Sequence, residues 1–179
     1  MKKIIIFLLA NIVLYAHPHI FIDVYPKINI QDTKATSLSV EWKFDQMTSS
    51  VLIMDYDKNK DNKFSENEMA LIKRNTIKLF KDHDYYLKIR ESDRNVEIEK
   101  LDNFVATIDE AGRLVYSFDL ICSFEIKESV LMFYDKGSYI SFMLKKTLLE
   151  PLNKNINFYI RRVDNEIYFG YAMLIKDII

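Results

Sequence analysis

The chain has 179 residues, 49% of them hydrophobic and 13% aromatic, which is enough for one domain with a full hydrophobic core. Its 25 Lys and Arg residues nearly balance its 26 Asp and Glu residues, so the formal net charge is −1. This balance provides no overall basic footprint, and we expect neither nucleic acid nor an anionic membrane surface to attract the chain as a whole.

The first residues predict a secretory signal. Lys2 and Lys3 precede an apolar run over residues 4–14, and the small Ala16 follows it. A basic start, a short apolar core and a small residue at the cleavage site are typical of such signals. The run is shorter than the roughly 20 apolar residues that a membrane span needs. We therefore expect a signal peptide over 1–16 and a periplasmic mature protein over 17–179. A buried first strand of a cytosolic protein would explain the apolar run but not the lysines.

The next segment predicts two strands and two helices. The stretches "HIFIDVYPKINI" and "TSLSVEWKF" alternate apolar and polar residues, as half-buried strands do. Asp45 is placed to cap a helix over "QMTSSVLIMDY". In the following stretch, Met69, Ile72, Ile77 and Phe80 recur at helical spacing. We expect a helical hairpin over about residues 45–82.

Beyond Asp84 the strand pattern returns and continues to the end of the chain. The segments are "YYLKIRE", "NVEIEK", "RLVYSFDLICSF", "ESVLMFYD", "SYISFML", "NFYIRRV" and "EIYFGYAML". "DEAGR" and "VDNE" are typical of hairpin turns. Cys122, the single cysteine, lies within an apolar strand pattern and is expected in the core. The sequence thus predicts one mainly β (α+β) domain, an antiparallel sandwich into which an EF-hand-like helix-loop-helix is inserted.

The segment between the two predicted helices, "DKNKDNKFSENE", has the spacing of an EF-hand calcium loop. Such a loop uses oxygen ligands at positions 1, 3 and 5, a sharp turn at 6, a backbone carbonyl at 7, a water-mediated contact at 9 and a bidentate carboxylate at 12. The residues at the ligand positions are Asp57, Asn59, Asp61, Lys63, Ser65 and Glu68. Asn62 replaces glycine at the turn, and Asn tolerates positive φ better than most residues. We expect a structural Ca²⁺ site. The alternative is a solvated charged loop.

Two of the three histidines lie at the predicted new N-terminus. On a strand, His17, His19 and Asp23 share one face. An N-terminal histidine chelates through its amine and Nδ1, His19 can add a nitrogen and Asp23 a carboxylate, and such nitrogen sets suit zinc, nickel or copper. Pro18 lacks the N–H that a square-planar amide-nitrogen site requires. The alternative is the solvated start of a strand. His83 either completes this site or caps the second helix, and we favour the cap.

These motifs together resemble a family of small exported bacterial proteins of unknown function. The family is described as the periplasmic component of an uncharacterised ABC-type transport system. The resemblance rests on "AHPHIFID", "VEWKFDQMTSS", "DKNKDNKFSENE", "DYYLKI", "GRLVYSFDL" and "YDKGSYISF", in this order. It implies an accessory to nickel, cobalt or zinc permeases. In that reading His17 and His19 face the metal, and the calcium ligands are Asp57, Asn59, Asp61 and Glu68.

The leading hypothesis is a non-enzymatic periplasmic metal-binding protein that captures or delivers a divalent transition metal for a membrane permease. A second hypothesis is a calcium-stabilised interaction module with no transition-metal role. The third and weakest is a copper-dependent oxidase, for which the sequence indicates neither a substrate face nor an axial ligand. The sequence has no Ser-centred motif and no histidine pair at helical spacing, so it does not suggest a hydrolase. The metal, the direction of transport and the number of subunits stay open.

Overall fold

The structure is a computed structural model and describes residues 20–137, 139–164 and 169–179. Its strands are β1 (Ile20–Gln31), β2 (Lys34–Phe44), β3 (Leu87–Glu91), β4 (Arg94–Val96), β5 (Lys100–Ile108), β6 (Leu114–Glu125), β7 (Ser129–Asp135), β8 (Ile140–Met143), β9 (Ile156–Asp164) and β10 (Phe169–Ile178). Its helical segments are α1 (Gln46–Tyr56), α2 (Glu66–Asp82), the short 3₁₀ turn η1 (Asp84–Tyr86) and α3 (Lys146–Leu149).

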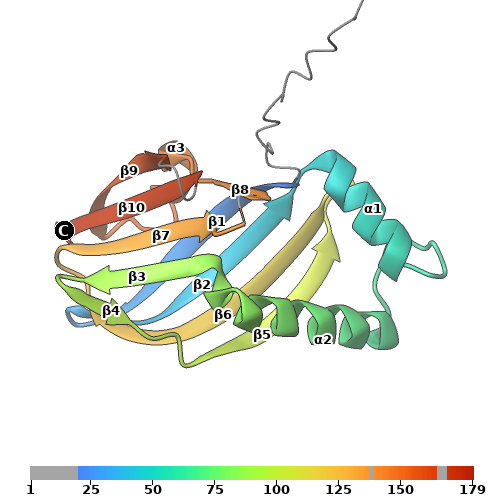
Figure 1. Ribbon diagram of the computed structural model, residues 1–179, viewed down its shortest axis with the longest axis horizontal. Helices are drawn as coiled ribbons and strands as arrows, with labels where there is room; N and C mark the ends of the chain where they lie inside the picture. Colours follow the sequence, from blue (N-terminus) through green and yellow to red (C-terminus); the bar gives the residue numbers. More distant parts are fainter. Residues whose placement is uncertain (1–19, 138, 165–168) are drawn as a thin grey trace, which may run out of the picture.

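The described strands form two sheets, shown in Figure 1. The first sheet has the order β5-β6-β2-β1-β8 and the second the order β4-β3-β7-β10-β9. Neighbours run antiparallel, apart from β1 and β8, which pair in parallel. The prediction of a mainly β, sandwich-like α+β domain is confirmed, and α1 and α2 follow β2 as expected.

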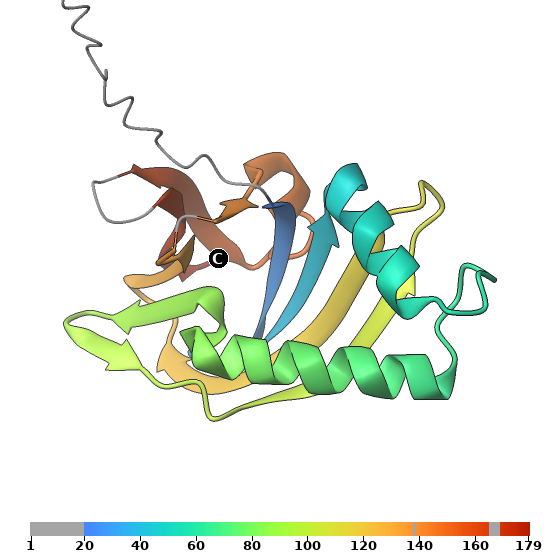
Figure 2. The same cartoon turned by 45° about the vertical axis from the view of Figure 1, so that its right-hand side comes forward.

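The inner face of the first sheet is covered by the second sheet and by α2. Alternation along β1 buries Ile22 and Val24 while Asp23 lies on the opposite face. Helix α2 brings Phe80 to within 4.6 Å of the Trp42 ring centroid, on the same side of the sheet. Figure 2 shows α2 crossing in front of the first-sheet strands. The outer face of the first sheet is therefore the side that carries Asp23.

The edge of β1 is closed by one buried amide side chain. Only residues 20–23 of β1 pair with β8, which leaves backbone groups further along β1 without a strand partner there. Asn153 Oδ1 accepts from Ile28 N at 3.0 Å, and its Nδ2 donates to the Pro26 carbonyl at 2.9 Å. Asn153 thus replaces a neighbouring strand, and the buried backbone groups stay paired.

The turn between α2 and β3 uses an unusual backbone conformation. Asp84, Tyr85 and Tyr86 have φ of 51°, 56° and 53°, in the left-handed region that costs roughly 1–2 kcal/mol for each non-glycine residue. Packing holds the turn in place, because Tyr86 is buried and stacks on His83 with ring centroids 4.9 Å apart. His83 occupies the C-cap position of α2, where its backbone N–H donates to the carbonyls of Phe80 and Lys81.

The strand region contains one turn that the sequence predicted and one strand that it did not. The turn predicted at "DEAGR" is confirmed, since Asp109 N bonds the Arg113 carbonyl and Gly112 has φ of 76°. The strand β5 was not predicted. Its pairing with β6 shifts register between Asp102 and Val105, and Asn103 has φ of 50°. This bulge interrupts the alternation by which a strand is recognised. The turn predicted at "VDNE" falls largely outside the described residues.

Candidate metal sites

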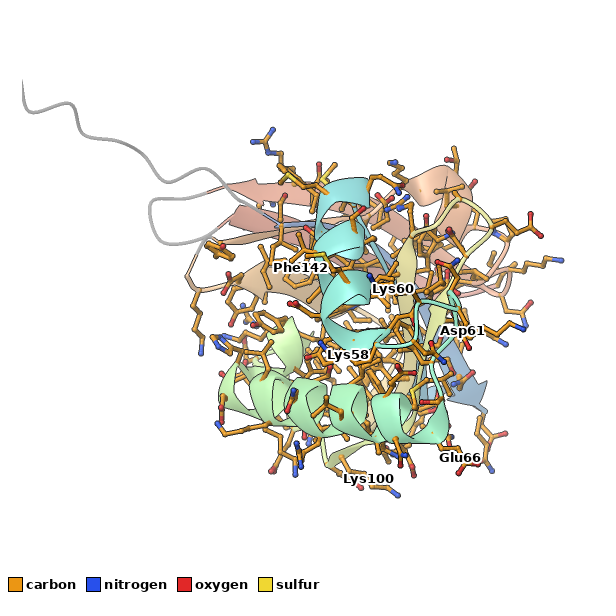
Figure 3. The ribbon with its side chains drawn as sticks, turned by 90° about the vertical axis from the view of Figure 1, so that its right-hand side faces the viewer. Lys58, Lys60, Asp61, Glu66, Lys100 and Phe142 are labelled. Atoms are coloured by element: carbon orange, nitrogen blue, oxygen red, sulfur yellow. The ribbon has the colours of Figure 1, made fainter. Side chains whose placement is uncertain are left out.

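The predicted calcium loop lies between the two helices of the hairpin. Helix α1 ends at Tyr56, and Ser65 is the N-cap of α2, so residues 57–65 form the connection and Glu68 lies in the first turn of α2. Figure 3 labels Lys58, Lys60 and Asp61 in this connection, near α1 and above α2 in that view. This is the helix-loop-helix arrangement that an EF-hand site requires.

The first ligand position is held inside the loop. Asp57 is only 4% exposed, and both of its carboxylate oxygens accept backbone hydrogen bonds. Oδ1 accepts from Asp61 N at 3.2 Å and Oδ2 from Asn62 N at 2.9 Å. Asn62 has φ of 59°, the left-handed conformation expected where glycine is usual. The chain therefore curls around the Asp57 carboxylate.

The next ligand positions follow the same curl. Asn59 Oδ1 accepts from Asp61 N at 3.2 Å, and Asp61 Oδ1 accepts from Lys63 N at 2.9 Å. Asn59 Nδ2 donates to Asp61 Oδ2 at 3.0 Å, which keeps the two side chains together. Hydrogen bonds from the chain thus gather the oxygens of Asp57, Asn59 and Asp61 around one short loop.

Glu68 closes the loop from the start of α2. Its Oε1 accepts from Lys58 N at 2.7 Å, while Oε2 accepts from Ser65 N at 2.9 Å and Ser65 Oγ at 2.8 Å. Ser65 and Glu68 form a capping box. The hydrogen bond from the Ser65 hydroxyl is the main reason that the pKa of Glu68 lies below its usual value, followed by the backbone N–H groups of Ser65 and Lys58. The group is a carboxylate at neutral pH.

These residues fit Ca²⁺ in the kind and order of their oxygens. Within the described ranges, no three His, Cys, Asp or Glu side chains converge as a ready metal-binding group. Calcium, however, also takes amide, hydroxyl and backbone oxygens, with 6–8 ligands in all. To bind Ca²⁺ through both carboxylate oxygens, Glu68 would give up its hydrogen bonds to Lys58 and Ser65. Phe64 is partly buried against the core and anchors the loop there.

Asp23, the proposed carboxylate of the histidine site, lies among cations. Its Oδ2 is 3.2 Å from Arg113 Nη2, and its Oδ1 is 3.6 Å from Lys145 Nζ. Arg113 also donates to the carbonyls of Lys43 and Phe44. The carboxylate thus joins β1 to the ends of β2 and β6. His17 and His19 lie outside the described residues, so the structure does not show whether they approach Asp23.

The start of β1 is attached to α1 by a pair of hydrogen bonds. Asp45 N donates to the Phe21 carbonyl at 2.9 Å, and Phe21 N donates to Asp45 Oδ2 at 3.0 Å. The same carboxylate caps α1 through Thr48 N and Thr48 Oγ1. Partial burial alone would raise the pKa of Asp45, but these hydrogen bonds together lower it below its usual value. We call Phe21, Asp23, Asp45 and Arg113 the strand-end cluster.

Sequence reasoning found the Asp45 cap but missed the other links of this cluster. Arg113 is 90 positions from Asp23, and nothing in the local pattern joins them. The expected core position of Cys122 is confirmed, and burial raises the pKa of its thiol to about 12. The thiol is therefore protonated at neutral pH.

The comparisons with known proteins establish the family but no activity. The family described as "protein of unknown function (DUF1007)" matches residues 3–165, and the chain belongs to it. No curated protein matches the sequence. None of the helices that the structure describes is long and apolar enough to cross a membrane.

Proposed function

We propose that this member of the DUF1007 family is an exported, periplasmic metal-binding accessory protein. In this proposal it captures or delivers a divalent transition metal, such as zinc, nickel, cobalt or copper, for a membrane transporter. Loop 57–68 binds Ca²⁺ and stabilises the fold, and His17 with His19 binds the transition metal.

The geometry of loop 57–68 is the observation that supports the proposal most directly. The inward carboxylate of Asp57, the left-handed Asn62 and the position of Glu68 in the first turn of α2 agree with the spacing of an EF-hand loop. A solvated charged loop would have no need to bury Asp57 or to bring Glu68 back to Lys58 N. Calcium binding is thus the best-supported part of the proposed function.

The transition-metal site is supported by its position in the chain. In the sequence, His19 directly precedes Ile20, where β1 begins. Phe21 and Asp23 follow on the outer face of the first sheet, where Phe21 is exposed and Asp23 is partly exposed. Cleavage after Ala16 would add the amine of His17, and a chelate within one residue costs little ordering entropy. Asp23 Oδ1, which faces the exposed Lys145, is the candidate third group.

The experiment that tests the metal site moves the amine and leaves both imidazoles in place. Exported protein with its native terminus is compared with a variant carrying one Gly before His17, by titration with zinc, nickel and copper. We expect a clear loss of affinity in the Gly-extended protein, similar to that of His19→Ala, and a larger loss as the pH falls through about 6.5. Equal affinities would show that the amine is not a ligand.

A second candidate function is a calcium-stabilised interaction module. It is favoured by one observation, the exposed apolar side chains Met47, Val51 and Met54 on α1. If neither the native nor the Gly-extended protein binds a transition metal, this function replaces the first.

A further inference from the structure

A cavity of about 450 Å³ lies on the outer face of the first sheet. We call it the outer cavity. Residues of β1, β2, β5 and β6 line it, and so do Leu148 in α3 and Leu152 in the turn that follows. Both leucines keep apolar surface exposed, at 43% and 39%. The outer cavity therefore has the size of a small-molecule site and an apolar part of its own.

A row of three side chains crosses the outer cavity in register. Tyr25 on β1 is paired with Glu41 on β2, and Glu41 is paired with Ser117 on β6. Cβ atoms of residues paired in this way lie about 5 Å apart. All three residues line the cavity and are partly buried. In the part of the chain that the structure describes, none of the three side chains forms a hydrogen bond or an ion pair.

The next row adds charges of both signs. Lys27 on β1 is paired with Ser39, which is paired with Asp119. Ser39 Oγ and Asn103 Nδ2 donate to the two carboxylate oxygens of Asp119, each at 2.7 Å. Asn103 is the left-handed residue of the β5 bulge, and the bulge thus turns its amide towards Asp119. Lys27 is exposed and has no ion-pair partner among the described residues.

The charges around the outer cavity are already paired. The ion pairs are Asp23 with Lys145, Lys43 with Asp109, and Lys100 with Asp102. Glu41 and Lys27 differ from these residues, because each lines the cavity with its charge unpaired. A partly buried carboxylate has lost some of its water, and a cationic ligand would restore the lost interaction. The cavity thus offers one free negative and one free positive group to a ligand.

We propose that the outer cavity binds a free α-amino acid with an apolar side chain. The α-ammonium group lies against Glu41 and Ser117, next to the ring of Tyr25, which attracts a cation to its face. The α-carboxylate pairs with Lys27. The apolar side chain covers the two exposed leucines of the cavity wall. This inference does not depend on the proposed metal sites.

The two free charges favour a zwitterion over a simple ion. A simple amine would satisfy Glu41 but leave its own charge beside Lys27 with no anion between them. A simple carboxylate would satisfy Lys27 but meet Glu41 and Asp119, two groups of its own sign. The end of a peptide carries only one of the two charges. A free amino acid carries both on adjacent groups, and a cavity of about 450 Å³ has room for one such molecule.

The test is calorimetric titration of the exported protein with L-leucine and three relatives. The relatives are 3-methylbutylamine, which lacks the carboxylate, 4-methylpentanoate, which lacks the ammonium group, and glycine, which lacks the apolar side chain. We expect leucine to bind, and each relative to bind at least about tenfold more weakly, since a charge-assisted hydrogen bond is worth more than the roughly 1.4 kcal/mol of a tenfold change.

Two substitutions locate the site. Glu41→Gln and Lys27→Gln should each weaken leucine binding by about tenfold. Neither side chain has a described partner, so both variants should melt as the native protein does. Glu110→Gln is the matched control, because Glu110 is an exposed carboxylate in the turn between β5 and β6 and does not line the cavity. This variant should bind leucine as the native protein does.

Three outcomes would overturn the proposal. If the native protein does not bind leucine at millimolar concentration, the cavity is not an amino-acid site, and the metal sites are unaffected. If 3-methylbutylamine or 4-methylpentanoate binds as tightly as leucine, the ligand is a simple ion. If leucine binding persists unchanged in Glu41→Gln and in Lys27→Gln, the amino acid binds elsewhere on the protein.

Discussion

Loop 57–68 and the strand-end cluster are both built on carboxylates, but they are assembled in opposite ways. In the loop, the hydrogen bonds of Asp57, Asp61 and Glu68 reach no further than 10 positions along the chain. In the strand-end cluster, Asp45 bonds a residue 24 positions away and Asp23 one 90 positions away. The loop is thus encoded in one short segment, whereas the cluster exists only once the first sheet has formed.

This difference separates what each region contributes to stability. The loop carboxylates bring several negative charges together, and a cation relieves their repulsion. Asp23 and Asp45 already have their partners, a guanidinium and several N–H or hydroxyl groups. We therefore expect the loop to make stability dependent on calcium and the strand-end cluster to act equally with and without it.

The largest expected effect is on the calcium response. A ligand at about a hundredfold excess over Kd stabilises the folded state by about 2.7 kcal/mol. We expect calcium to raise the melting temperature of the native protein. Glu68→Gln should remove most of this rise, because it replaces the carboxylate that we propose binds Ca²⁺ through both oxygens. Thermal unfolding with calcium and with chelator measures the difference.

The matched control is Glu66→Gln. It removes a charge two positions earlier in the same helical turn but no ligand of the predicted set. The calcium rise should persist in this variant. A native protein whose melting curve is the same in calcium and in chelator would reduce the loop to a charged turn.

The same contrast explains how much could be predicted from the sequence. Ligand spacing, the Asp45 cap and the α2 pattern are local, and the structure has α1 and α2 where the sequence placed them. The ion pair of Asp23 with Arg113 could not be predicted, because it depends on β1, β2 and β6 lying side by side. The strand β5 was missed because a bulge at Asn103 breaks its alternation.

Helix α1 shows that the spacing of apolar residues does not always predict which face of a helix is buried. Its extent was predicted correctly, but its apolar residues occur on more than one side, so the pattern does not show which face is buried. The buried side holds Ser49, whose hydroxyl accepts from Leu114 N at the start of β6, and the core-packed Leu52, Ile53 and Tyr56. The side of α1 that stays exposed therefore follows from contacts with distant segments, and a helical period alone does not predict it.

The second prediction concerns Arg113 in the strand-end cluster. Arg113→Met should lower the free energy of unfolding by about 2 kcal/mol, because it leaves the Asp23 carboxylate and two strand carbonyls without their charged donor. The loss should be the same in calcium and in chelator. Urea unfolding in both conditions measures it.

Arg94→Met is the matched control for that change. Arg94 pairs with Glu91 at 2.7 Å on an exposed hairpin, and such pairs contribute less than about 1 kcal/mol. If the two substitutions cost the same, the cluster is no more than a surface ion pair.

The smallest expected effect is that of Asp45, and it should depend on pH. Asp45→Ala removes the cap of α1 and the bond to Phe21 N, and a lost cap costs about 1 kcal/mol. The pKa of Asp45 is lower in the folded state than its ordinary value of 3.8. The stabilisation that the Asp45 carboxylate gives to the folded state is therefore present at a pH above 3.8, and it is lost as the pH falls through the pKa of the folded state. The difference in unfolding free energy between the native protein and Asp45→Ala should therefore narrow from about pH 5 to about pH 2.

Asp45→Asn keeps a capping oxygen but does not titrate, so the difference in unfolding free energy between Asp45→Asn and Asp45→Ala should change little over this range. A native-to-Ala gap that is constant with pH would show that the charge of Asp45 contributes nothing to the attachment of α1.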